Sequence, residues 1–546
     1  MLLPDAPGYD ELVRAFKWTI PDRFNIGTAI SDAWAAREPD REALVYVNED
    51  GTVTRFSYGE LSRLSNQLAN LLRDRGVHAG DRIGVLLPQR PETAIAHIAA
   101  LKLGAITIPL FTLFGEEALA YRLTNSGARA VITDAVGADK ISRIRENLPH
   151  LTTVLSVDGD SPGAEDLHAH IHGHEATFRP FETRPDDPAL IIYTSGTTGQ
   201  PKGALHGHRV LPGHLPGVQM SHDFLGQPGD RIWTPADWAW IGGLLDVLMP
   251  ALYLGVPVVA CRFRKFTADA AFQLMQDHGI RNAFLPPTAL KMMRQVEAPE
   301  KNWSLDLRSV ASGGEMLGAE LIEWGRRIFG LTINEFYGQT ECNMIVSSSA
   351  KLMEARPGIM GRPVPGHTVS VVSETGDVLP SGEQGNIAVK APSPVMFLGY
   401  WNNDSATRRK FAGDWLLTGD QGVCDDDGWI RFVGRDDDVI TSSGYRIGPG
   451  EIEDCLLKHN AVAMAGVVGK PCPTRTEIVK AYIVLKDGHD PSDTLALEIA
   501  EFVKTRLAAH EYPREISFVD ALPMTTTGKV IRKDLRVRAS EELKDL

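Results

Sequence analysis

From about residue 57 the chain alternates between two spacings of apolar residues. Residues 58–75 and 92–103 repeat them at helical spacing, whereas residues 82–87 form a short continuous apolar run between these two segments. Further runs of this kind are bounded by glycine, proline or aspartate and occupy residues 130–133, 189–193, 256–260 and 282–285. Because parallel strands that are buried on both faces read as continuous apolar runs, the alternation predicts a doubly wound α/β core.

The pattern changes after about Gly358. Short alternating strands with Gly, Pro and Asp-Gly turns predict a small antiparallel barrel or sheet, with a hairpin at Asp427-Gly428 between residues 421–424 and 429–433. A new α+β pattern begins past residue 437, with helices predicted over 450–459 and 494–509 and strands over 462–468 and 481–485. We therefore expect a domain boundary at residues 435–438.

Composition limits the functions that this fold can serve. The chain has 546 residues, 43% of them hydrophobic and 23% charged, which fits a globular protein with a large core and exceeds one small module. Its 56 lysines and arginines against 70 aspartates and glutamates give a net charge of −14, so no nucleic-acid partner is expected. A cationic site in this chain has to be local.

Cysteine use and the apolar stretches bear on the compartment. Five scattered cysteines without a CxxC pair favour a reducing environment over a disulfide framework or a zinc site. The N-terminal segment carries acidic residues where a secretory signal carries basic ones, and the two most apolar stretches are interrupted by charged residues and prolines. We expect a cytoplasmic protein without membrane insertion; the sequence leaves a homo-oligomer open.

The most informative segment is YTSGTTGQPKG at residues 193–203, where a strand end leads into a loop of glycines and small hydroxyl residues. Such a loop can present backbone N–H groups and hydroxyls to a polyphosphate. It is not a Walker A loop, because Pro201 and Gly203 flank the lysine. The predicted phosphate cradle consists of Thr194, Ser195, Gly196, Thr197, Thr198, Gly199 and Lys202.

This string resembles the signature of the acyl-adenylate-forming superfamily, which contains acyl-CoA synthetases, carrier-loading adenylation domains and luciferases. Further matching strings follow in the family's order: Gly313-Gly314-Glu315, YGQTE at 337–341, TGD at 418–420, GRDDDVITSSGYRIGPGEIE at 434–453 and LPMTTTGKVIRK at 522–533. The segments FKWTIPDRFNI at 16–26 and WTPADWAWIGG at 233–243 are most similar to medium-chain acyl-CoA synthetases and their acetyl and aryl relatives.

The resemblance covers nearly the whole chain and implies its architecture. The expected fold class is α/β, with a large N-terminal domain of two doubly wound sheets plus a small β-barrel over residues 1–435. A smaller mobile α+β C-terminal domain over residues 438–546 would carry the catalytic lysine, with a hinge at residues 436–437. Asp437 matches the family's hinge residue, a type of position that absorbs a dihedral change.

The resemblance also implies the roles of individual residues. Lys529 would reach the carboxylate and the α-phosphate, and Glu341 with the hydroxyl of Thr194 would hold Mg²⁺. After domain rotation Ser443, Gly444 and Tyr445 would face CoA. Besides the cradle and Lys529, the nucleotide would be bound by Gly313, Gly314, Glu315, Tyr337, Gly338, Gln339, Thr340, Asp420, Arg435 and Arg446, with Asp420 and Arg435 on the ribose.

The acyl pocket follows from the same matching. Acetate-specific relatives close it with a tryptophan where this chain has Gly338, so a deep slot for several methylenes or a ring is expected. Each further buried methylene adds about 0.8 kcal/mol, and a tryptophan at Gly338 should shift preference towards acetate or propionate. The expected lining is Trp240, Ile241, Gly242, Gly313, Gly314 and Gly338.

The sequence therefore predicts an AMP-forming acyl-CoA synthetase. A medium-chain fatty or aromatic carboxylate would react with ATP to give acyl-AMP and pyrophosphate, and CoA would then take the acyl group. ATP, Mg²⁺ and CoA are the expected substrates and cofactor, with no tightly bound organic cofactor. The alternatives are a stand-alone adenylation enzyme that passes the acyl group to a carrier protein or an amine, a non-catalytic nucleotide-binding protein, and luciferase-like oxidation.

Overall fold

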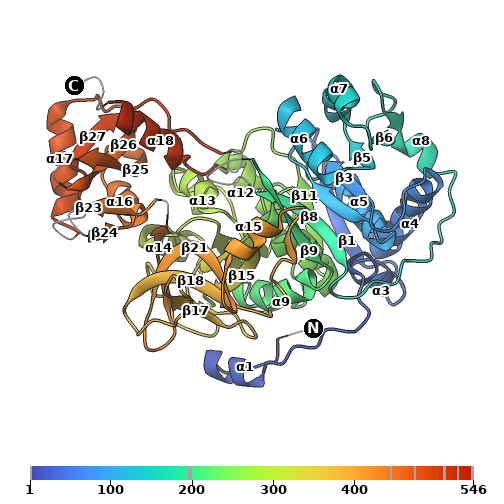
Figure 1. Ribbon diagram of the computed structural model, residues 1–546, viewed down its shortest axis with the longest axis horizontal. Helices are drawn as coiled ribbons and strands as arrows, with labels where there is room; N and C mark the ends of the chain where they lie inside the picture. Colours follow the sequence, from blue (N-terminus) through green and yellow to red (C-terminus); the bar gives the residue numbers. More distant parts are fainter. Residues whose placement is uncertain are drawn as a thin grey trace.

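The structure is a computed structural model that describes residues 3–194, 200–436, 438–442, 445–472, 475–507, 512–525 and 528–542 (Figure 1). The side chains of residues 441, 445, 446 and 451 are outside this description. Several predicted site residues therefore lie outside the described residues, namely Ser195, Gly196, Thr197, Thr198, Gly199, Asp437, Ser443 and Gly444.

The first sheet has nine strands in the order β16-β15-β14-β13-β12-β10-β11-β1-β2. Its central pairings are parallel, whereas β2, β15 and β16 pair antiparallel at the two edges. The strands are β1 (Glu42–Val47), β2 (Val53–Ser57), β10 (Ile232–Trp233), β11 (Val258–Cys261), β12 (Asn282–Phe284), β13 (Ser309–Gly313), β14 (Asn334–Gln339), β15 (Cys342–Ser347) and β16 (Arg362–Pro363).

The second sheet has eight strands in the order β19-β9-β8-β4-β3-β5-β6-β7. The predicted run at residues 130–133 is strand β5, and the predicted phosphate segment leaves the end of β8. The strands are β3 (Arg82–Leu86), β4 (Ile106–Pro109), β5 (Ala130–Thr133), β6 (Thr153–Ser156), β7 (Glu165–Asp166), β8 (Pro188–Thr194), β9 (Lys202–Gly207) and β19 (Gly399–Tyr400).

The largest core lies between these two sheets. It joins Leu44 of the first sheet and Ile83 of the second through α4 (Tyr58–Asp74) and α5 (Pro91–Lys102). Helix α5 buries every residue except Glu92, and a capping box of Ser57 and Glu60 begins α4. The other helices before residue 360 are α1 (Tyr9–Ala15), α2 (Ile26–Ala29), α3 (Asp32–Ala35), α6 (Glu116–Ser126), α7 (Ala135–Ile144), α8 (Leu167–Ile171), α9 (Val210–Ser221), α10 (Ile241–Gly243), the π-helix η2 (Leu244–Leu248), α11 (Met249–Leu254), α12 (Ala268–Asp277), α13 (Pro287–Met293) and α14 (Ala319–Ile328), with 3₁₀ turns η1 (Arg145–Asn147) and η3 (Pro299–Lys301).

A third sheet stands where the sequence predicts the small barrel. Its five strands pair antiparallel, and the predicted Asp427-Gly428 hairpin joins the last two. Hairpin register places Asp420 opposite Arg435. The elements are β17 (Val369–Val372), β18 (Gln384–Lys390), α15 (Asp404–Arg409), β20 (Phe411–Ala412), β21 (Trp415–Cys424) and β22 (Ile430–Arg435).

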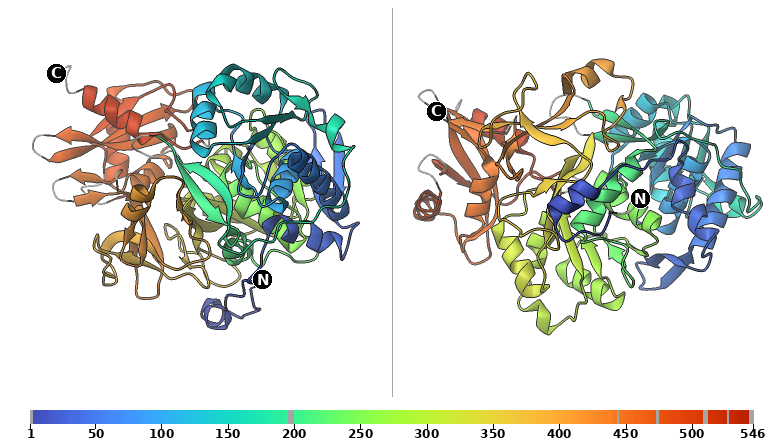
Figure 2. Two further views of the ribbon diagram at one scale, coloured as in Figure 1. Left: turned by 45° about the vertical axis from the view of Figure 1, so that its right-hand side comes forward. Right: turned by 90° about the horizontal axis from the view of Figure 1, so that it is seen from below.

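The C-terminal part forms a separate α+β unit with its own buried clusters, which draw only on residues 440–539. Figure 1 shows this unit, orange to red, beside α13 and α14, and Figure 2 shows it from two further sides. Its elements are β23 (Ile440–Ser442), β24 (Tyr445–Ile447), α16 (Pro449–Leu456), β25 (Val462–Cys472), β26 (Thr476–Leu485), α17 (Asp493–Lys504), β27 (Glu515–Phe518) and α18 (Arg532–Glu541).

The architecture confirms the predicted fold class: parallel-cored α/β sheets, an antiparallel sheet and a smaller C-terminal α+β unit. None of the helices within the described ranges has the length and apolar character needed to cross a bilayer. The exact domain boundary at residues 436–437 and the mobility of the C-terminal unit stay predictions.

Candidate active site

The two ends of the predicted phosphate loop lie side by side. Thr194 at the end of β8 pairs with Lys202 at the start of β9 in antiparallel register. The Tyr193 hydroxyl donates to Asn125 Oδ1 at 2.8 Å and ties this end of β8 to α6. The described flanks of the loop are therefore held at the carboxyl end of β8, an edge where α/β sheets bind ligands.

The predicted segments at 337–341 and 418–420 meet across two sheets. Tyr337 on β14 donates its hydroxyl to Asp420 Oδ2 on β21 at 2.5 Å, and Gln339 Nε2 donates to the Thr418 carbonyl at 2.8 Å. Lys410 Nζ, which the sequence did not single out, donates to Gln339 Oε1 at 2.9 Å. Long-range pairing thus joins two motifs that the sequence shows only as separate strings.

Asp420 and Arg435, the predicted ribose pair, lie opposite each other on neighbouring strands. These strands are β21 and β22, and Asp420 is partly buried. Burial raises the pKa of Asp420, while its bond from Tyr337 and the charges of Arg435 and Lys529 oppose that rise. A carboxylate held beside cations in this way can accept hydrogen bonds from a sugar diol.

Glu341 lies in the turn between β14 and β15 and has a partner that the sequence analysis missed. The hydroxyl of Tyr400 on β19 donates to Glu341 Oε1, and Lys202 Nζ lies 5.2 Å from the centre of the Tyr400 ring. Burial followed by the Glu341 charge raises the pKa of Tyr400 well above its usual range. The GYW string at 399–401 carried no signal, because its relation to Glu341 exists only through the β9–β19 pairing.

Lys529 of the C-terminal unit reaches this site. Its Nζ lies 5.7 Å from the centre of the Trp240 ring and 3.7 Å from where a Cβ on Gly314 would be. The pKa of Lys529 is lowered from its usual value, mainly by desolvation; the charges of Glu315 and Asp420 oppose this decrease, and the charge of Arg435 adds to it. Thr288 Oγ1 donates to the Gly528 carbonyl at 3.2 Å and anchors the lysine loop on α13.

Aromatic rings occupy the room beside the predicted pocket glycines. Gly314 has a φ of +95°, and a Cβ there would lie 3.1 Å from the Trp240 ring. The ring centres of Trp240 and Phe284 are 5.7 Å apart, and those of Phe284 and Phe336 are 5.1 Å apart. The absent side chains therefore make space for aromatic walls, a reason for glycine that the sequence could not reveal. The same explanation holds for Gly242 and Gly313. A Cβ on Gly242 would lie 2.7 Å from the Trp240 ring, and a Cβ on Gly313 would lie 2.6 Å from the Phe336 ring.

Gly338 is enclosed by backbone. A Cβ there would lie 2.4 Å from the Met344 nitrogen and 2.7 Å from Asn343 Oδ1, and Met344 itself has a φ of +53°. A tryptophan at Gly338 does not fit unless β15 moves. The expected shift towards acetate in that variant stays a prediction, but this substitution would also disturb the strand, so Trp240 offers the cleaner test.

The remaining predicted residues fall into two groups. Ile241 is buried at the start of α10, and Glu315 Oε2 lies 3.8 Å from Lys291 Nζ beside the nucleotide segment. Tyr445 and Arg446 lie on β24, but their side chains are outside the described residues, as are Ser443, Gly444 and Asp437. The predicted roles of both groups stay predictions.

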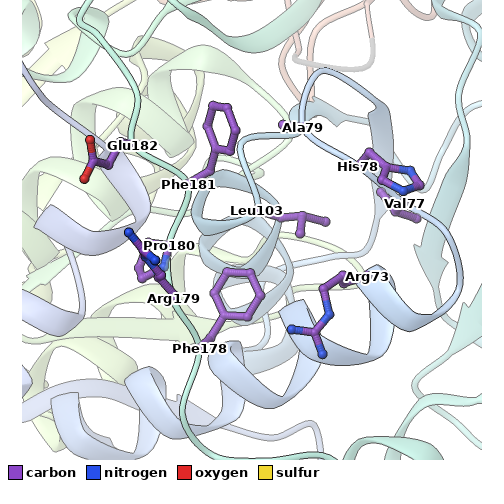
Figure 3. Close-up of a pocket in the computed structure, with 10 residues that line it drawn as sticks. All are labelled: Arg73, Val77, His78, Ala79, Leu103, Phe178, Arg179, Pro180, Phe181 and Glu182. Carbon is purple, nitrogen blue, oxygen red and sulfur yellow. The ribbon is translucent and has the colours of Figure 1, made fainter.

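A surface cavity of about 560 Å³ lies elsewhere, along the C-terminal end of α4 (Figure 3). Figure 3 shows Phe178 and Phe181 on the extended segment that crosses it, with Arg73 of α4 opposite. None of the predicted site residues lines this cavity. The converging acid, cation and loop ends instead favour the region around Lys529 as the candidate active site.

Comparisons with known proteins agree with this geometry. The sequence model of the family described as AMP-binding enzyme matches residues 31–401, and that of the AMP-binding enzyme C-terminal domain matches residues 451–529. The chain is 34% identical over 548 residues to the acetyl-coenzyme A synthetase of Bacillus subtilis (strain 168), covering 97% of this chain and 94% of that protein. It is 33% identical over 541 residues to the mitochondrial acyl-coenzyme A synthetase ACSM3 of Mus musculus, covering 97% and 93%.

A solved structure shares the fold over nearly the whole length. The anthranilate CoA ligase AuaEII, in complex with anthranoyl-AMP, superposes with a TM-score of 0.87 at 28% identity, covering 96% of this chain and 99% of that one. Sequence family and three-dimensional likeness thus point to one group of enzymes.

Proposed function

The chain belongs to the AMP-binding enzyme family, and from this premise we propose that it activates a medium-chain fatty or aromatic carboxylate. It is an AMP-forming acid–thiol ligase that uses ATP and CoA. In the first half-reaction a carboxylate oxygen attacks the α-phosphorus and pyrophosphate leaves. In the second the CoA sulfur, after losing its proton, attacks the acyl carbon and AMP leaves.

The observation that carries the proposal is the position of Lys529 against the Gly314 segment and Trp240. Adenylation brings one anion against another, so a cation between carboxylate and α-phosphate lowers the barrier. Lysine suits this role because its compact charge sits on a long stem. Desolvation lowers the pKa of Lys529 overall, and the charges of Glu315 and Asp420 limit that decrease.

Asp420, Arg435 and Tyr337 would bind the nucleotide sugar. Asp420 would accept from the ribose hydroxyls while Arg435 donates to the same sugar, and the Tyr337 hydroxyl holds the Asp420 carboxylate in place at 2.5 Å. A positioned carboxylate loses less orientational freedom on binding, which strengthens binding of both ATP and acyl-AMP.

Glu341 and Thr194 would hold Mg²⁺. A carboxylate and a hydroxyl are the hard oxygen donors that this ion prefers, and Glu341 is only 7% exposed, so the residues fit the ion. Bound there, Mg²⁺ would neutralise charge on the phosphates. Tyr400 would orient the Glu341 carboxylate by its hydrogen bond to Oε1.

The walls of the proposed acyl pocket support an apolar acid. The partly exposed ring of Trp240 gives an aromatic surface beside Lys529, and the buried rings of Phe284 and Phe336 continue the ring contacts from Trp240 into the core. Flat rings pack against such a surface in offset or tilted arrangements, and methylenes also gain from contact with it. Anthranilate, the acid named for the structural neighbour AuaEII, is aromatic.

Product analysis tests the proposal. Purified protein is incubated with ATP, Mg²⁺ and CoA and with straight-chain acids from acetate to dodecanoate, benzoate and anthranilate, and AMP, ADP and acyl-CoA are quantified together. We expect AMP and acyl-CoA in equal amounts, highest with acids of intermediate length or with the aromatic acids. A maximum at acetate would overturn the proposed substrate class, and AMP without thioester would indicate another acceptor.

Replacing Tyr400 by phenylalanine should raise the Mg²⁺ concentration needed for half-maximal ATP–pyrophosphate exchange. Hydrogen bonds to charged groups contribute about 1.5–3 kcal/mol, so we expect roughly a tenfold shift in Mg²⁺ requirement. Titration of Mg²⁺ at fixed ATP measures it. Tyr46→Phe, on β1, removes a hydroxyl that donates to Asn48 Oδ1 at 3.3 Å and is the matched control. An unchanged Mg²⁺ titration in Tyr400→Phe contradicts the orienting role.

Replacing Trp240 by alanine should change the acid preference. Loss of the ring removes an aromatic contact of about 0.5–1.5 kcal/mol, so kcat/KM for the best acid should fall about three- to tenfold. Longer acids should improve relative to it, because the ring no longer fills the space next to Gly314. The same acid panel measures this. Trp303→Ala, which removes a ring stacked on Phe272 at 5.0 Å in another cluster, should keep the preference of the unmodified protein.

A further inference from the structure

Helix α18 begins three residues after Lys529 and carries two arginines on one face. Arg532 and Arg536 are four positions apart, so their side chains lie above one another on the helix. Leu535 packs this helix on β25, where a Cβ on Gly466 would lie 2.7 Å from its Cδ1. The start of α18 therefore has a fixed place in the C-terminal unit.

Both arginines converge on Asp438. Arg536 Nη1 donates to Asp438 Oδ1, and Arg532 Nη1 lies 3.6 Å from Asp438 Oδ2. The Asp438 side chain is only 9% exposed, which makes this contact less screened by water than a surface ion pair. Asp438 is the residue directly after the predicted hinge position.

Arg532 has a second acidic partner. Its Nη2 donates to Glu453 Oε2 on α16 at 2.6 Å, and Glu453 Oε1 accepts from the Val467 backbone N–H on β25 at 2.8 Å. The charges of Glu453 and Asp438 raise the pKa of Arg532 against the effect of burial. Arg532 is therefore held by two acidic side chains, and these two contacts limit rotation of the first turn of α18 about the helix axis.

The acidic partner is itself tied to the nucleotide site. The Asp438 backbone N–H donates to the Arg435 carbonyl at 2.9 Å, and Arg435 faces Asp420. A continuous chain of contacts thus runs from the ribose pair through Asp438 and Arg536 to the helix that follows Lys529. It links segments 98 residues apart in the sequence.

We propose that the ion-pair cluster of Arg532, Arg536, Asp438 and Glu453 locks the Lys529 loop to the chain after the hinge, so that the arginines are positioning residues for Lys529. The inference rests on the proposed role of Lys529 in adenylation. A flexible lysine stem has to be brought to its target within a fraction of an ångström, and a displacement of 1 Å can lower a rate about 10²-fold. With the cluster intact, the segment after the predicted hinge and the Lys529 loop would keep a fixed position relative to each other.

Arg536→Met is the test, because methionine keeps much of the side-chain length and removes the charge. We expect kcat of ATP–pyrophosphate exchange to fall about ten- to hundredfold with KM for ATP changed less than about twofold. Thioester formation from supplied acyl-AMP should stay within about twofold, since that step does not use Lys529. Arg536→Lys should recover part of the exchange rate.

Arg538→Met is the matched control on the same helix. Arg538 is 55% exposed and its Nε lies 4.0 Å from Glu542 Oε1, so both half-reactions should be unchanged. Asp438→Asn gives a second, nearly isosteric variant, and the double variant with Arg536→Met should lose little more than either single one. Such non-additive losses of exchange rate would show that Arg536 and Asp438 act as a pair, and either single variant tests the pair if the other folds poorly.

Two results would overturn the inference. One is an equal loss of both half-reactions in Arg536→Met together with a lowered melting temperature, which assigns the cluster to folding alone. The other is unchanged exchange in both Arg536→Met and Asp438→Asn. Failure of the proposed function is a separate result, because then the unmodified protein shows no exchange with any acid of the panel.

Discussion

Lys529→Ala should lower the rate of acyl-AMP formation by about 10²- to 10³-fold while thioester formation from supplied acyl-AMP stays nearly unchanged. Removing the side chain leaves carboxylate and α-phosphate without the cation that approaches Gly314 and Trp240 in this structure. ATP–pyrophosphate exchange measures the first step, and release of AMP from synthetic acyl-AMP in the presence of CoA measures the second.

The matched control for this variant is Lys533→Ala. Lys533 is exposed on α18, four residues beyond Lys529, and should leave both half-reactions at the level of the unmodified protein. Lys529→Arg is expected to retain little activity, because the planar guanidinium does not reproduce a compact ammonium. An equal loss of both half-reactions in Lys529→Ala would show that the lysine does not act in adenylation alone.

Asp420→Ala should raise KM for ATP about 100-fold. The proposed bonds from the ribose hydroxyls to this carboxylate are each of a kind that contributes about 1.5–3 kcal/mol, and two of them correspond to at least that factor. The variant also leaves the partly buried Tyr337 hydroxyl without its acceptor at 2.5 Å, so we expect a loss of about 1 kcal/mol in unfolding free energy. Exchange kinetics over ATP concentration and denaturant unfolding measure the two effects.

Asp420→Asn separates these two effects. Asparagine keeps the shape of the side chain and one acceptor for the Tyr337 hydroxyl but loses the charge. The unfolding free energy should therefore return closer to that of the unmodified protein than KM for ATP does. Asp414→Ala, an exposed residue between β20 and β21, should leave both unchanged. A KM for ATP within about threefold of the unmodified value in Asp420→Ala would refute the ribose assignment.

Local pattern was sufficient for several elements. The run at residues 130–133 is β5, and the helix predicted over 58–75 is α4 at Tyr58–Asp74. Here apolar periodicity and end signals agree with the burial that each element finds, so neighbours along the chain carry the needed information. Helix α17 ends at Lys504, earlier than the predicted 509; residues 508–511 lie outside the described residues.

Pocket shape was not accessible to the same reasoning. The glycines at 313 and 314 suggested empty depth, whereas the structure fills the adjoining space with the rings of Phe336 and Trp240. A glycine leaves an empty volume only when no other side chain fills the space beside it. Here the side chains that fill this space come from segments that are distant in the sequence. Gly338 shows the same limit, because the Met344 backbone occupies the place of its Cβ.

The sequence by itself determined the order of the elements, the family and the chemical types present at the site, because periodicity and short motifs are local properties. Only the tertiary structure decided the partners: Tyr400 on Glu341, Tyr337 on Asp420 and Thr288 on the carbonyl of Gly528, the last pair 240 residues apart. Such contacts depend on strand pairing and on the packing of the C-terminal unit against α13, and no window of sequence contains both members.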